Sequence, residues 1–212
     1  MSRCHNRRKG GNPRKKSKGK AKKLKMSIRV VEMPAMPAAP LSPTTEEPIV
    51  VMSGDAARKI VALVEGDPNH ECGAFLIGNL CKDRITGTVI AFVDDIYTDG
   101  AYGSGSDYEF TVDTQIACLR YVERNHEGRM HVFGTVHSHA NHPAFFSGTD
   151  YMMMNSRRVD EVHMVISPRY GEYVLTYKNK DGEYNHSAVL QTDETFFRFA
   201  RKRLQGGEAN AY

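Results

Sequence analysis

Apolar residues along the middle of the chain follow two different spacings, and each spacing predicts its own kind of element. Short runs rich in Val, Ile, Phe and Tyr, such as "IVVM" and "VHMVIS", are typical of buried strands. Strands are predicted at residues 49–52, 72–78, 87–97, 130–139, 162–167 and 172–178. These segments predict a sheet with a buried core.

Between the strands, apolar residues recur every three or four positions, which predicts helices. One helix follows a cap at Ser53 or Asp55, and a short one starts at Ser147. The predicted core-facing sets are Ala56, Ile60, Val61 and Val64; Val112, Ile116, Leu119 and Val122; and, in a last helix around 194–204, Phe196, Phe197, Ala200 and Leu204. Strands interleaved with helices predict the α/β class, with a single mixed sheet sandwiched by helices.

Charge divides the chain into a basic tail and an acidic body. Residues 1–26 contain twelve Lys and Arg and no acid, which leaves 17 of the 29 basic residues against 25 acidic ones. Such a like-charged, apolar-poor segment predicts a disordered tail. Three interpretations stay open: a solubilising extension, an upstream start codon with Met26 as the true first residue, or an arm that contacts RNA or another polyanion.

Composition also predicts where the globular domain lies. Residues 27–48 are proline-rich and predict a linker, 49–205 the domain, and 206–212 a flexible end. The four cysteines form no CxxC pair, and no signal peptide or membrane-spanning apolar run is present in the sequence. We therefore expect reduced thiols and a cytoplasmic protein without a membrane partner.

The stretch "HSHANHPAFFSGTD" carries the candidate chemistry. His137 and His139 are two apart at a strand end, so their side chains project from the same face. Asp150 lies one turn into the helix that Ser147 would start. Two imidazoles and a carboxylate form a zinc site that leaves one position open for water. The alternative is structural: Ser-x-x-Asp is also a capping box, and the histidines could be packed core residues.

These residues resemble the JAMM motif of the MPN-domain metalloproteases, His-Ser/Thr-His-x7-Ser-x2-Asp. "ECGAFLIG" places Glu71 and Gly78 at the interval of the family's upstream glutamate strand. Ala74 and Ala140 depart from the usual glycine and proline, but neither position supplies a ligand. The resemblance covers roughly residues 49–190 and implies the family's layered fold, which is similar to that of the cytidine deaminases.

Carried over by position, the resemblance implies a role for each matching residue. His137, His139 and Asp150 would bind Zn²⁺, Glu71 would act as general base and then general acid, and Ser147 would donate a hydrogen bond to the oxyanion. The implied activity is that of a zinc metalloprotease, an isopeptidase that cuts the amide bond after the Gly-Gly tail of ubiquitin or a ubiquitin-like protein. The substrate-binding residues stay unassigned.

Two other function classes stay open at this point. A catalytically silent MPN scaffold would bind a ubiquitin-like partner without turnover, and a nucleic-acid-associated protein would act through residues 1–26. The Gly-rich segment 98–108 occupies the position of a family insertion that folds over the substrate tail, or it is a plain connector.

Overall fold

The computed structural model describes residues 47–98 and 110–203. Its elements, in chain order, are β1 Ile49–Met52, α1 Gly54–Gly66, β2 Gly73–Lys82, β3 Val89–Tyr97, α2 Val112–His126, β4 His131–Ser138, α3 Gly148–Ser156, β5 Glu161–Ser167, β6 Glu172–Lys178, β7 Tyr184–Asn185, β8 Val189–Gln191, α4 Glu194–Phe199 and β9 Arg201–Lys202. No helix within these described ranges is long and apolar enough to cross a membrane.

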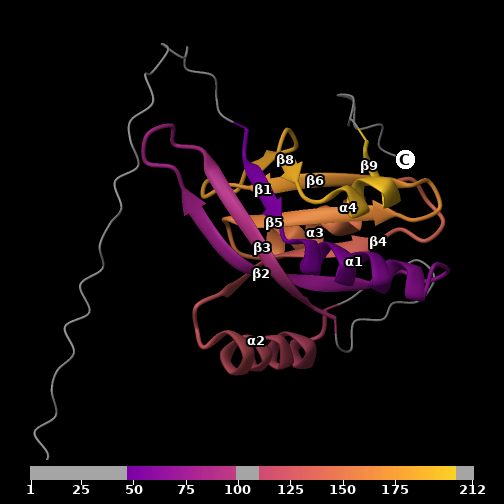
Figure 1. Cartoon of the computed structure of the whole chain (residues 1–212), viewed down its shortest axis with the longest axis horizontal. Helices are drawn as coiled ribbons and strands as arrows, with labels where there is room; N and C mark the ends of the chain where they lie inside the picture. The colour runs from indigo at the N-terminus through magenta and orange to yellow at the C-terminus, as the bar shows by residue number, and fades with distance from the viewer. Residues whose placement is uncertain (1–46, 99–109, 204–212) are drawn as a thin grey trace, which may run out of the picture. The chain divides into compact units, whose positions relative to one another are not determined.

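The strands of the described residues form one mixed sheet in the order β7-β6-β5-β4-β2-β3-β1-β8, with β9 beside β6 (Figure 1). β4 pairs antiparallel with β2 and parallel with β5, so it lies in the interior of the sheet. Helices α1 and α4 pack against one face, and α2 and α3 cover the other. The predicted fold class, a mixed sheet between helices, is confirmed.

Gly78 is required by packing in the sheet. A β-bulge interrupts the pairing of β2 with β3 next to this residue. A Cβ at position 78 would lie 1.8 Å from the carbonyl oxygen of Phe92, closer than any side chain tolerates. The glycine that contributed to the family resemblance therefore allows two strands to approach.

The predicted buried side of α2 is correct at Val122 and wrong at the other three positions. Val112 and Leu119 are 70% and 60% exposed, whereas Thr114, Cys118 and Val122 are buried. Tyr121 and His126 both contact the Asp95 carboxylate on β3, which turns the helix so that this second set faces the sheet. The polar contacts determine the orientation of α2, and its outer apolar residues stay in solvent.

The last helix is shorter than predicted. α4 ends at Phe199, Ala200 is extended, and β9 follows along β6. Backbone hydrogen bonds from Arg201 to Gly171 and from Arg203 to Tyr173 pair the chain with β6 in place of further helical turns. Phe196 is buried as predicted, Phe197 is 40% exposed, and Leu204 lies outside the described residues.

Candidate metal centre

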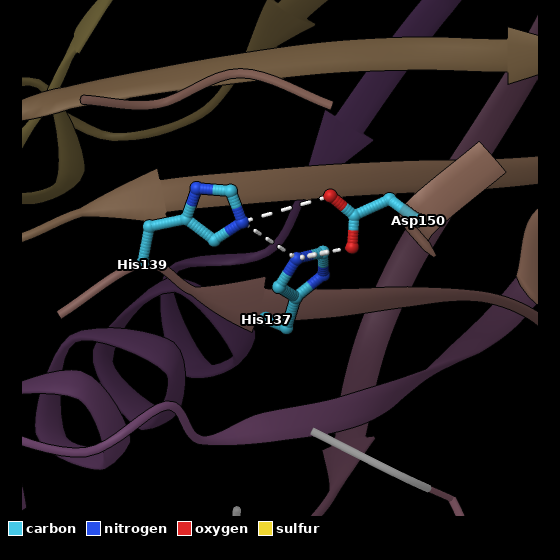
Figure 2. Close-up of side chains that lie close together, drawn as sticks. All are labelled: His137, His139 and Asp150. Atoms are coloured by element: carbon cyan, nitrogen blue, oxygen red, sulfur yellow. Dashed lines mark hydrogen bonds and ion pairs between the residues drawn. The ribbon is translucent and has the colours of Figure 1, made fainter. Parts of the chain in front are cut away.

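His137 and His139 come from the carboxyl end of β4. His137 lies in the strand, and the His139 amide donates to the Ile166 carbonyl of β5 just beyond it, which keeps the backbone extended. Both imidazoles are buried, and their Nε2 atoms lie 3.3 Å apart (Figure 2). The strand alternation expected from the sequence therefore brings the two rings together.

The orientation of the His139 ring is set by the loop that follows β4. Its Nδ1 lies 3.4 Å from the Pro143 carbonyl oxygen, an acceptor that favours a proton on Nδ1. Nε2 then carries the lone pair that faces His137 and Asp150. A backbone carbonyl that orients a histidine in this way is the usual second partner of a metal-ligating imidazole.

Asp150 lies in the first turn of α3 and performs two tasks. One carboxylate oxygen accepts a hydrogen bond from the Ser147 amide at 2.6 Å, while the Asp150 amide donates to Ser147 Oγ at 3.2 Å. This is a complete capping box. The same carboxylate lies 3.0 Å from His137 Nε2 and 3.6 Å from His139 Nε2 (Figure 2). The capping box and the histidine cluster coexist.

Asp150 is ionised although it is buried. Burial alone would raise its pKa, but the close imidazoles of His137 and His139, together with the hydrogen bond from the Ser147 amide, hold the pKa of the Asp150 carboxyl well below its usual range. The centre therefore contains a fixed negative charge opposite two imidazole nitrogens. Such a charge balance favours a cation.

The spacing of the donor atoms fits zinc. One atom from each of His137, His139 and Asp150 lies within 4.8 Å of the others. Two ligands at about 2.0–2.1 Å from a tetrahedral zinc ion lie about 3.3–3.4 Å apart, close to the separation of the two Nε2 atoms. Two imidazoles and one carboxylate are also a donor set that zinc prefers. These three residues can hold the ion.

Glu71 precedes β2 beside this cluster. Gly73 pairs with His137, and Cys72 and Ser138 continue the ladder through a hydrogen bond from the Ser138 amide to the Cys72 carbonyl. Glu71 is thus the next residue along the ladder, level with His139, and the alternation of an extended chain directs it to the face of His137. Its side chain is largely buried, which is unusual for a glutamate.

Ser147 caps α3 at the edge of the same cluster. Its Oγ accepts a hydrogen bond from the Asp150 amide, so the hydroxyl proton is available to donate to another group. The Cys72 side chain points away from the histidine cluster. Its Sγ lies 3.2 Å from Ser138 Oγ, among the buried residues on the other face of the sheet. The thiol is therefore separate from the cluster. Cys72, Cys81 and Cys118 are all free.

A buried polar row beside the cluster was not predicted from the sequence. His163 Nδ1 lies 2.9 Å from Thr135 Oγ1, and its Nε2 lies 3.5 Å from the Glu161 carboxylate. Burial, followed by the nearby charges of Arg157 and Lys178, lowers the pKa of His163 to about 3, so this imidazole is neutral. The polar residues of β4 and β5 are visible in the sequence. Which of them lie side by side depends on the register of the sheet, and the sequence does not show that register.

Several predicted segments lie outside the described residues. These are the basic tail 1–26, the linker 27–48 except for its last two residues, the segment 98–108 except for Thr98, and the end 206–212. Their proposed roles stay predictions.

Known proteins are similar to this chain in family and in fold. The family described as prokaryotic homologues of the JAB domain matches residues 53–181. The solution structure of protein DSY2949 from Desulfitobacterium hafniense is similar with a TM-score of 0.52 and 17% identity, over 68% of this chain and 94% of that one. At this identity the likeness shows the fold alone. No curated protein matches the chain.

Proposed function

Because the chain belongs to the family of prokaryotic JAB-domain homologues, we propose that it is a zinc-dependent isopeptidase. Its substrate would be the amide bond that follows the Gly-Gly tail of ubiquitin or a ubiquitin-like protein. The convergence of His137, His139 and Asp150 on one point carries the proposal. The wider JAB/MPN family includes hydrolases, which supports an enzymatic role.

In this proposal His137, His139 and Asp150 hold the metal. A zinc ion bound there would act as a Lewis acid that makes water more acidic and polarises the scissile carbonyl. The low pKa of the Asp150 carboxyl keeps that ligand ionised at neutral pH. The orientation of His139 by Pro143 supplies a second ligand in the required tautomer.

Glu71 and Ser147 would act on the substrate. Glu71 would accept a proton from the attacking water and deliver it to the departing amine, as general base and then general acid. Ser147, with its hydroxyl proton still available, would donate to the carbonyl oxygen as negative charge develops there. Two glycines suit this reaction, because a tail without side chains can enter a narrow site and pair with a strand.

A single substitution tests the proposal. Glu71→Gln should keep the metal and reduce hydrolysis of C-terminal ubiquitin-like fusions by about 10²–10⁴-fold, the contribution of a positioned acid or base. Metal content and turnover are measured on both proteins, with Glu65→Gln, an exposed glutamate of α1, as the matched control.

Two outcomes would overturn the proposal. Equal rates of hydrolysis for the wild type and Glu71→Gln would show that Glu71 is not the general base. A wild type that binds zinc and a ubiquitin-like protein but cleaves nothing in the panel would favour the silent binding module.

A further inference from the structure

A pocket of about 480 Å³ lies at the opposite end of β4 from the histidines. It is an open cleft bordered by α2, the starts of β4 and β5, and the end of α3 with the residues that follow it. Its lining shares no residue with the metal centre. Its volume is in the range of sites that bury a small ligand. The pocket is a separate feature of the fold.

One half of the pocket wall is apolar and the other half is polar. Phe75, Leu119, Val122 and Val132 contribute hydrocarbon surface, and Cys118 lies among them. Burial raises the pKa of the Cys118 thiol to about 12, so this part of the wall carries no charge. An apolar body of a ligand would displace water from this surface with a gain in free energy.

The charged residues of the pocket, Arg157, Arg158 and Glu161, lie between the end of α3 and the start of β5. Arg157 is held by Glu161 through two hydrogen bonds, of 2.9 and 3.3 Å, and its guanidinium lies over the Phe75 ring. That carboxylate is therefore already neutralised. Among the described residues no carboxylate pairs with the exposed Arg158, which also lines the pocket. The lining carries a surplus positive charge at one end.

We propose that this pocket binds a small amphipathic carboxylate, whose apolar chain packs between α2 and the sheet and whose head group pairs with Arg158. An arginine matches a carboxylate in geometry and charge. The ordered pair of Arg157 and Glu161 forms a rigid polar wall next to that head group. This assignment does not depend on the proposed isopeptidase activity.

Octanoate, octanol and octylamine are the probes, titrated into the full-length protein by calorimetry and by amide chemical shifts. Octanoate should bind and shift the signals of Leu119 and Val122. Octanol and octylamine should bind at least about tenfold more weakly, since a charge-assisted hydrogen bond is lost or repulsion replaces it.

Two exposed positions test the two halves of the pocket. Arg158→Gln should weaken octanoate by about tenfold and leave octanol unchanged. Leu119→Ser should weaken both probes by a similar factor. Arg124→Gln, an exposed arginine of α2 that does not line the pocket, is the control and should change nothing.

Several results would overturn the assignment. Octylamine that binds as well as octanoate would exclude an anionic ligand, and unchanged affinity in both variants would exclude the pocket. Shifts confined to His139 and Asp150 would place the carboxylate at the metal centre. Binding of a hexapeptide with a free C-terminal leucine, but not of octanoate, would make the site a peptide receptor.

Discussion

Asp95 and Asp150 are both buried carboxylates, but Asp95 pairs with a lysine, whereas Asp150 faces two imidazoles. Lys59, Tyr121, His126 and the Ile96 amide surround Asp95 and join α1, β3 and α2. Asp150 faces two imidazoles, with the Ser147 amide as its backbone donor. Lys59 brings a permanent positive charge, whereas an imidazole brings a lone pair or a titrating proton. The Asp95 cluster is complete within the protein, and the Asp150 cluster has room for a cation.

The largest effect that would break this comparison is on zinc affinity. Asp150→Asn removes a charged ligand, so we expect zinc to bind more than about 100-fold more weakly. Loss of a residue that only hydrogen-bonds to a ligand costs about 10–100-fold in affinity, and loss of a ligand itself should cost more. Asp95→Asn should leave the affinity unchanged. Competition with a chromophoric chelator measures both. An equal loss of zinc in the two variants would show that the clusters do not have separate tasks.

Zinc should also stabilise the fold through only one of the two carboxylates. At a free concentration of 100 times the dissociation constant, zinc should raise the unfolding free energy of the wild type by about 2.7 kcal/mol. Asp95→Asn should gain the same stabilisation, and Asp150→Asn, which binds zinc more weakly, should gain less than about 0.4 kcal/mol at that concentration. Denaturant titrations with and without a chelator measure the effect. A gain in Asp150→Asn as large as that of the wild type would place the ion elsewhere.

Removal of the Asp95 charge should cost stability, and the cost should depend on pH. At pH 7 we expect Asp95→Asn to lower the unfolding free energy by about 1–3 kcal/mol, below the range for a fully buried ion pair because Lys59 is half exposed. Burial opposes ionisation here, but the bonds from Lys59 and Tyr121 outweigh it and lower the pKa of Asp95.

A lowered carboxyl pKa fixes the direction of the pH effect. The folded state holds the Asp95 proton less tightly than the unfolded state, so the stabilisation is present above the unfolded pKa of 3.8 and is lost as the pH falls below it. The difference between wild type and Asp95→Asn should therefore shrink in acid unfolding below that pH. A constant difference from pH 7 to pH 2.5 would contradict this account.

The smallest effect is expected at Lys59. Lys59→Met should lower the unfolding free energy by less than about 1 kcal/mol, because its ammonium is half in water and Tyr121 and His126 still hold Asp95. Thermal and denaturant unfolding at low and high salt measure it. A loss as large as that of Asp95→Asn would show that the lysine alone neutralises the carboxylate.

The sequence predicted one cluster and missed the other for a physical reason. His137, His139, Ser147 and Asp150 lie within fourteen residues, so strand alternation and helix capping are enough to relate them. The partners of Asp95 are 26 to 36 residues away from it. Their association depends on how α1 and α2 dock on the sheet, and a local pattern cannot show this.

The two helix errors have the same origin. Apolar spacing placed Val112, Ile116 and Leu119 in the core, but the contacts of Tyr121 and His126 with Asp95 decide which side of α2 is buried. After α4, residues 201 and 202 pair with an edge of β6 and form a short strand. In both cases a tertiary hydrogen bond outweighed local periodicity.

Asp150 both caps α3 and belongs to the candidate metal centre, so the fold can be retained when the metal centre is lost. The carboxylate caps the start of α3 by accepting a hydrogen bond from the Ser147 amide, and this bond requires no metal ion. Selection for folding alone would therefore preserve the aspartate, while the two histidines drifted to other residues. A descendant chain without the two histidines could therefore keep the capped α3 and an intact domain.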